Sequence, residues 1–297
     1  IEQVQQIIDE ITEFHPSLTL NIANEPLIAK AFEHCVRQVK GRGLVATFNT
    51  NGVALTEDIA RLLVETQFDS VVVSVDAATA DTLKKVRGIR DLDKLVWTIE
   101  MLLEIRGEKT LPRIGVSFVP QPANQHEMPK FIEYWGKKVD FIRITGFVDD
   151  DQPRVSGGSL PPRIPCQQLY QNIVIRANGD VSPCVVCTVN PKIVMGNVFR
   201  DGGVLAVWRG ERLQHWRSLH DSGRWSELHP CHQCDYWVDS CGFKEEIRDG
   251  FLVRTSSPFT TFYNVIDRLK NWDRTVLHDR QGFSSGAPLP FSEDKNQ

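Results

Sequence analysis

The front half of the chain alternates between two hydrophobic periods. Residues 1–14 place Ile, Val and Phe side chains three and four positions apart, and Pro16 ends this run. We therefore predict an amphipathic helix there. Shorter apolar and β-branched runs predict strands. Further helices are predicted at 27–39, 59–63, 92–105 and 128–135, and strands at 18–22, 44–48, 70–75, 113–119 and 139–144.

Strands that alternate with helices favour parallel βαβ units, which predicts an α/β fold. Ligands bind such units at the carboxyl ends of the strands. Those ends carry the polar segments 23–26, 49–52 and 74–77, so we expect polar chemistry to collect there. The opening helix has no strand before it, and we therefore expect the repeat to lack its first strand.

The cysteines are concentrated in the back half, where six of the seven fall between residues 166 and 241. A Cys-x2-Cys pair lets one tight turn present two thiolates to the same metal, and two such pairs occur here. The front half has too few cysteines for a disulfide scaffold, so reduced thiolates in a cytoplasmic protein fit better. The candidate metal ligands are Cys166, Cys184, Cys187, Cys231, Cys234 and Cys241.

A hairpin is predicted to bring the first two of these cysteines together. Asn178-Gly179 is a preferred two-residue turn, and the flanking segments read as paired strands. Folding back at this turn returns Cys184 towards Cys166.

Composition excludes two classes of partner. The net charge is −4 without a basic run, so nucleic acid is not expected. The sequence has no stretch of about 18 apolar residues, so no membrane span is predicted, and no secretory signal is visible.

Taken together, these motifs resemble the radical S-adenosylmethionine (SAM) superfamily, specifically members with a C-terminal SPASM or twitch domain. The resemblance covers about residues 1 to 250. It implies a partial (βα)6 barrel, here lacking its first strand, followed by a small cysteine-rich domain that holds one or two auxiliary [4Fe-4S] clusters.

The resemblance also implies where SAM binds. Ala23-Asn24-Glu25-Pro26 stands where the family usually has Gly-Gly-Glu-Pro, while Thr50-Asn51-Gly52 and Ser74-x-Asp76 match later family segments. Each segment also has an ordinary structural explanation, as a helix start or a turn, and Arg90 competes with Arg87 for the SAM carboxylate. The implied contacts are Asn24, Glu25, Asn51, Ser74, Asp76 and Arg87.

For the cysteines, the resemblance implies one auxiliary cluster on Cys166, Cys184, Cys231 and Cys234. Cys187 and Cys241 would lie nearby, either exchanging with these ligands or holding a second, incomplete cluster. The competing interpretation is a four-cysteine zinc site on a degenerate barrel that acts as a non-catalytic interaction module.

The family's Cys-x3-Cys-x2-Cys motif, which holds the catalytic [4Fe-4S] cluster, does not occur in this sequence. We expect a fragment cut just after that loop rather than a degenerate member, and the catalytic residues are unassigned. The implied full-length enzyme cleaves SAM reductively and uses the 5′-deoxyadenosyl radical to take hydrogen from a small alcohol, a sugar or a peptide. The implied electron donor is a flavodoxin or ferredoxin.

The expected organisation has four parts. They are a barrel at 1–148, a linker at 149–165, the auxiliary-cluster domain at 166–250, and a C-terminal helix through Phe262 with a disordered tail at 251–297.

Overall fold

A computed structural model describes residues 1–22, 24–146, 160–256 and 259–264. Its main sheet has eight strands in the order β1-β2-β3-β4-β5-β10-β9-β8, and β1 to β5 run parallel. This confirms the α/β prediction and the partial barrel. The parallel strands are β1 (Leu18–Thr19), β2 (Ala46–Thr50), β3 (Ser70–Ser74), β4 (Arg113–Phe118) and β5 (Phe141–Thr145).

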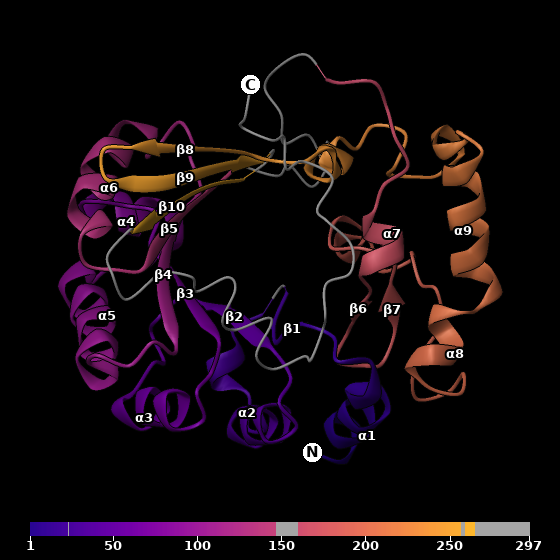
Figure 1. Cartoon of the computed structure of the whole chain (residues 1–297), viewed down its shortest axis with the longest axis horizontal. Helices are drawn as coiled ribbons and strands as arrows, with labels where there is room; N and C mark the ends of the chain where they lie inside the picture. The colour runs from indigo at the N-terminus through magenta and orange to yellow at the C-terminus, as the bar shows by residue number, and fades with distance from the viewer. Residues whose placement is uncertain (23, 147–159, 257–258, 265–297) are drawn as a thin grey trace, which may run out of the picture.

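Helices pack against one face of these strands because alternate strand residues are apolar. Val71 and Val73 of β3 are fully buried and share one core with Leu63 and Leu102 from the helices. Figure 1 shows the helices outside the curved sheet. They are α1 (Glu2–Ile11), α2 (Phe32–Gly41), α3 (Glu57–Glu65), α4 (Ala80–Arg87), α5 (Leu92–Arg106) and α6 (Met128–Gly136).

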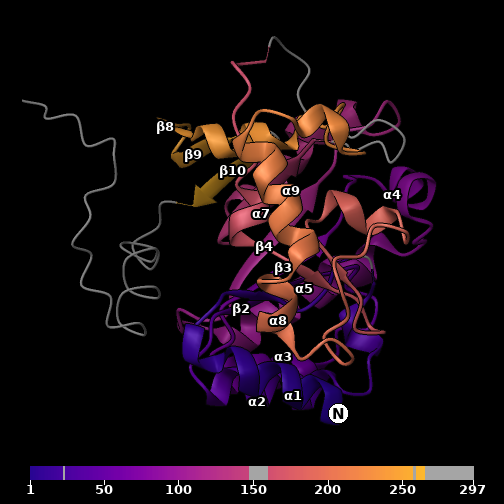
Figure 2. The ribbon, with the colours of Figure 1, turned by 90° about the vertical axis from the view of Figure 1, so that its right-hand side faces the viewer.

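The cysteine-rich region lies on the other, inner side of the sheet, as Figures 1 and 2 both show. It has a small core of its own, which includes Val181, Met195 and Leu213. Its elements are α7 (Gln168–Gln171), β6 (Val174–Ile175), β7 (Val181–Ser182), α8 (Val204–Trp208) and α9 (Glu211–Asp221).

After the cysteines the chain returns to the main sheet. The strands β8 (Lys244–Arg248), β9 (Phe251–Ser256) and β10 (Phe259–Asn264) form an antiparallel meander, and β10 pairs with β5. The expected boundary at residue 250 therefore falls inside a hairpin.

Phe262 corrects the expected C-terminal helix. It lies in β10 opposite Ile142, because the aromatic and β-branched run 259–263 suits a strand. The rest of that helix, the tail and most of the expected linker lie outside the described residues. None of the helices in the described part of the chain has the length and hydropathy needed to cross a bilayer.

Helix α1 joins the two cores. Its Ile8 packs in the barrel core, whereas Ile11 packs in the core of the cysteine-rich region. The Glu10 carboxylate accepts hydrogen bonds from the backbone N–H groups of Val204 and Leu205, both at 2.8 Å, and so caps the start of α8. A Cβ at Gly203, where φ is +101°, would lie 2.5 Å from Glu10 Oε2, so the approach requires glycine.

We expect Glu10→Ala to lower the free energy of unfolding by about 1–3 kcal/mol, because two buried N–H groups of α8 lose a charged acceptor. Urea unfolding followed by circular dichroism measures this. Glu13→Ala, at an exposed position just after α1, is the matched control and should change stability by less than about 0.5 kcal/mol. Equal effects of the two substitutions would contradict the capping role.

Candidate functional site

The Glu25 carboxylate connects two loops at the carboxyl end of the sheet. Its Oε1 accepts hydrogen bonds from Leu27 N (3.2 Å) and Thr50 Oγ1 (2.7 Å), and its Oε2 accepts one from Asn51 N (2.8 Å). The segment after β1 is thus joined to the segment after β2. A carboxylate offers about four acceptor positions, so one on Oε2 is left for another donor.

Asn24 and Asn51, also expected at this end, hold their own turns. Asn24 Oδ1 accepts a hydrogen bond from Ile22 N at 3.3 Å, and Asn51 Oδ1 accepts one from Val53 N at 2.8 Å. Their side chains therefore shape the two loops that Glu25 links.

Asp76 connects the next pair of loops. Its backbone has φ +60°, its Oδ1 accepts a hydrogen bond from Val119 N at 2.7 Å, and its Oδ2 pairs with Arg87 Nη1 at 2.6 Å. Burial raises the pKa of Asp76, and the Arg87 charge partly opposes that shift. Ser74 lies beside it at the end of β3, with its Oγ 3.4 Å from Ser117 Oγ.

Arg87 is therefore partly committed to an internal ion pair. Its side chain is 27% exposed, and its buried Nε has no hydrogen-bond partner among the described residues. The guanidinium can still offer donors to a second, anionic group next to Asp76.

Glu127 also belongs to this region structurally, although no sequence motif marks it. Its carboxylate accepts hydrogen bonds from Ala78 N (2.6 Å), Thr79 N (3.2 Å), Thr79 Oγ1 (2.6 Å) and Thr82 Oγ1 (2.8 Å). Burial alone would raise the pKa of Glu127, but these four hydrogen bonds outweigh it and the pKa is lowered. The loop after β3 and the start of α4 are fixed in this way.

The second site is a buried cavity in the cysteine-rich region. Cys166 precedes α7, Cys184 and Cys187 follow β7, and Cys231 and Cys234 follow α9. All five line the cavity, together with apolar and aromatic side chains. Cys241, the sixth expected ligand, is exposed at the end of a 3-10 helix (Tyr236–Cys241) and does not line it.

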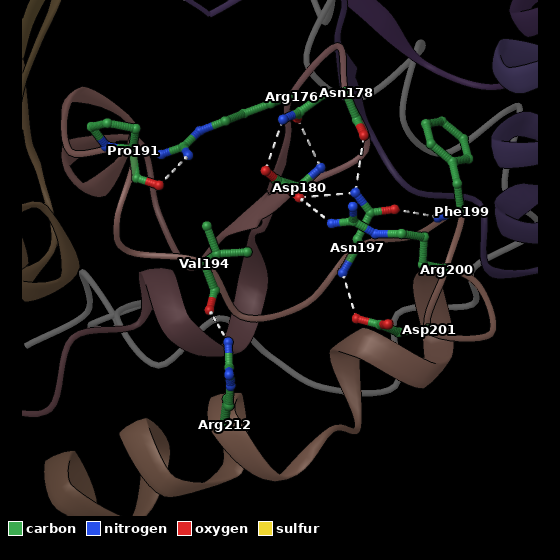
Figure 3. Close-up of polar contacts among 10 residues, drawn as sticks. All are labelled: Arg176, Asn178, Asp180, Pro191, Val194, Asn197, Phe199, Arg200, Asp201 and Arg212. Carbon is green, nitrogen blue, oxygen red and sulfur yellow. Dashed lines mark hydrogen bonds and ion pairs between the residues drawn. The ribbon is translucent and has the colours of Figure 1, made fainter.

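The predicted hairpin is present and carries the first cysteines to this cavity. Strands β6 and β7 pair antiparallel around Gly179, whose φ is +86°. Figure 3 shows the Asn197 side chain below the turn, where its Nδ2 donates to Asn178 O (2.9 Å) and to Asp180 Oδ1 (2.8 Å). A Cβ at Gly179 would lie 2.3 Å from the Phe199 ring, so this close packing requires glycine.

Arg176 ties the hairpin to the turn that bears Cys187. Its guanidinium donates to the carbonyl oxygens of Cys187 (3.3 Å), Thr188 (3.2 Å), Asn190 (3.0 Å) and Pro191 (3.3 Å). One half-buried cation thus orders four carbonyl groups in the turn that bears Cys187.

Two of the thiols interact directly, with Cys184 Sγ and Cys187 Sγ 3.5 Å apart. Their hydrogen bond lowers the pKa of Cys184 and, together with burial, raises the pKa of Cys187. Burial raises the pKa of Cys166 to about 11 and that of Cys234 to about 12. A ligand must therefore displace protons from most of these thiols.

The number of thiols fits a cluster better than a single ion. A tetrahedral zinc takes four ligands, whereas five thiols line this cavity. Across the described residues, no three His, Cys, Asp or Glu side chains converge closely enough to hold one metal ion. Five thiols spread around one buried cavity instead suit a ligand with several metal centres.

Three further side chains enclose the cavity. Arg163 Nη1 donates to Cys234 O at 2.7 Å and Nη2 to Cys231 O at 3.4 Å, so the guanidinium clamps the second Cys-x2-Cys turn. His220 Nδ1 accepts a hydrogen bond from Cys166 N at 3.2 Å. Burial, together with the Arg163 charge, lowers the pKa of His220 to about 4. Trp237 completes the wall.

Comparison with known proteins agrees with this geometry. The SPASM family model, an iron–sulfur cluster-binding domain, matches residues 166–235. That range contains all five cysteines of the cavity and leaves out Cys241.

Relatives extend the similarity to most of the chain. Mycofactocin maturase MftC of Mycobacterium tuberculosis is 24% identical over 277 residues, covering 80% of this chain and 68% of the relative. A tungsten-containing aldehyde ferredoxin oxidoreductase cofactor-modifying protein of Pyrococcus furiosus is 29% identical over 290 residues, covering 80% and 79%. Streptococcus suis SuiB, bound to its precursor peptide SuiA, shares the fold with a TM-score of 0.60 at 12% identity, covering 73% of this chain and 60% of SuiB.

Glu127→Gln is expected to lower the free energy of unfolding by about 1–3 kcal/mol at pH 7, because an amide replaces one charged acceptor in a fully used site. The pKa of Glu127 is lowered from its ordinary value of 4.5, so its stabilisation is complete above about pH 4.5 and is lost as the pH falls through the lowered value. Denaturant unfolding at several pH values checks this. Glu133→Gln, at an exposed position in α6, is the control; a stability loss from Glu127→Gln that persisted at acid pH would contradict the role.

Proposed function

We propose that the chain belongs to the radical SAM enzymes with a SPASM domain, and that its full-length form cleaves SAM reductively and abstracts hydrogen from a substrate. The observation that supports this most is the cavity lined by five thiols inside the SPASM match, attached to a partial barrel with polar loops at its strand ends. When bound, the catalytic [4Fe-4S] cluster and SAM supply a 5′-deoxyadenosyl radical.

We propose that SAM lies across the carboxyl ends of β2 and β3. The open acceptor position on Glu25 Oε2 suits the methionyl ammonium, and the remaining donors of Arg87 suit the carboxylate. Ser74 offers a hydroxyl between them, while Asn24, Asn51 and Asp76 hold the surrounding loops in place. The contribution of these residues is to orient SAM before the reaction.

We propose that Cys166, Cys184, Cys231 and Cys234 hold one auxiliary [4Fe-4S] cluster. Cys187 lines the same cavity, and its Sγ lies 3.5 Å from Cys184 Sγ, so we place it beside that ligand rather than on the cluster. Cys241 is exposed and outside the family match, so it has no part in this cluster. The proposed auxiliary cluster would accept the electron left on the substrate, making the net reaction an oxidation.

The substrate we propose is a peptide or a small alcohol or sugar. SuiB is bound to a precursor peptide, and MftC is a maturase, so peptide maturation is the first class to test. A flavodoxin or ferredoxin would supply the electron for SAM cleavage.

Anaerobic reconstitution with iron and sulfide should give a brown protein with about four iron atoms per chain and broad absorbance at about 400 nm. Serine at Cys166, Cys184, Cys231 or Cys234 removes a thiolate ligand and should abolish or strongly reduce iron uptake. Iron analysis and absorbance spectra measure this. Cys187→Ser and Cys241→Ser are the controls and should keep a full cluster. A colourless protein with one tightly bound zinc would instead support the interaction module.

In the full-length enzyme, Cys184→Ala should abolish product while SAM cleavage continues, since the catalytic cluster remains but the electron acceptor is lost. Chromatography of 5′-deoxyadenosine and mass spectrometry of the substrate separate the two outcomes. Cys241→Ala is the control. Normal product yield from Cys184→Ala would refute the electron-accepting role.

A further inference from the structure

Three buried N–H donors surround the thiol cavity and have no acceptor. They are Arg163 Nε, His220 Nε2 and Trp237 Nε1, none of which has a hydrogen-bond partner within the described residues. All three side chains line the same cavity as the five cysteines. A buried donor without an acceptor costs about 1–3 kcal/mol, so three at one cavity indicate that the acceptor belongs to the ligand of the cavity.

The orientation of His220 follows from its other nitrogen. Nδ1 accepts the Cys166 N–H at 3.2 Å and therefore carries no proton itself. The proton of the neutral ring must then be on Nε2, which is the buried atom without a partner. The imidazole is thus fixed at one nitrogen by the backbone of a proposed ligand residue and offers an N–H at the other.

Arg163 and Trp237 are held together behind the second Cys-x2-Cys turn. The guanidinium carbon lies 4.8 Å from the Trp237 ring centroid and 5.2 Å from that of Trp225. The two Nη atoms of Arg163 donate to the carbonyl oxygens of Cys234 and Cys231, and its buried Nε has no acceptor among the described residues. Trp237 is 2% exposed, so water cannot serve its N–H freely.

We propose that His220 and Trp237 donate N–H hydrogen bonds to sulfur atoms of the auxiliary cluster and, with the Arg163 cation, raise its midpoint potential. Sulfides and thiolates are the acceptors that a cluster brings, and reduction adds negative charge to them, so donors and a nearby cation stabilise the reduced state more than the oxidised one. This inference rests on the proposed function, because it requires a cluster in the cavity. These three are positioning residues: they act on the cluster rather than on the substrate.

The test is a redox titration of the reconstituted chain followed by electron paramagnetic resonance. This sequence has no Cys-x3-Cys-x2-Cys motif, so the signal comes from the auxiliary site without overlap. Trp237→Phe keeps an aromatic six-membered ring but removes the N–H together with the pyrrole ring, and it should shift the midpoint potential to a more negative value. Trp225→Phe is the matched control: that ring also contacts Arg163 but does not line the cavity, and its substitution should leave the potential unchanged.

His220 allows a paired substitution. His220→Asn can keep an acceptor near the Nδ1 position but loses the Nε2 donor, whereas His220→Gln places an amide N–H near Nε2. We expect a more negative potential for His220→Asn and recovery towards the wild-type value for His220→Gln. If His220 had a purely structural role, His220→Gln would not have a higher midpoint potential than His220→Asn.

A measurement on the unaltered protein guards against variants that fail to fold. Pulsed paramagnetic resonance of the reduced cluster in H2O and D2O should show exchangeable proton couplings from the N–H groups. Equal potentials for wild type, Trp237→Phe and His220→Asn at equal iron content, or the absence of exchangeable couplings, would overturn the inference. A wild-type chain that takes up no cluster would instead contradict the proposed function itself.

Discussion

The cysteine-rich region depends on bringing thiols from three separate chain segments to one buried cavity. Among the described residues, its apolar core contains eight buried side chains, and one of these, Ile11, comes from α1. A core of that size supplies little stability on its own. The region therefore relies on polar ties between loops and, in the proposed function, on the free energy of binding a cluster.

Those polar ties share one chemistry, in which an arginine donates to carbonyl oxygens of the cysteine turns. Arg176 binds the carbonyl groups behind Cys187, and Arg163 binds those of Cys231 and Cys234. A guanidinium can serve several carbonyl groups at once because its donors spread in a plane. The backbone of each turn is thus ordered from behind, and the thiols are left directed at the cavity.

Apolar and β-branched runs are enough to predict the barrel strands, because the strands of a parallel sheet are buried on both faces, as are residues 71–73 of β3. The Asn178-Gly179 hairpin can also be predicted from the sequence, since a turn depends only on local residues. Contacts between residues far apart in the sequence cannot be predicted in this way. Glu127 binds residues 45 to 49 positions away, and nothing in its neighbours marks it as a cap. At Phe262 the apolar pattern of the sequence fits a helix as well as a strand. The pairing of β10 with β5 decides for the strand, and this pairing depends on residues far away in the sequence.

Three carboxylates connect neighbouring loops in pairs at the carboxyl end of the sheet, and these loops form its rim. Glu25 accepts the N–H of Asn51, Asp76 accepts that of Val119, and Glu127 accepts those of Ala78 and Thr79. Each bond crosses from one βα loop to another, so the rim is ordered before any ligand arrives. A ligand that binds there loses less free energy to ordering the protein. The same bonds use up most acceptor positions on these carboxylates, so selectivity at the rim must come from what they leave open: one position on Glu25 and the unpaired donors of Arg87.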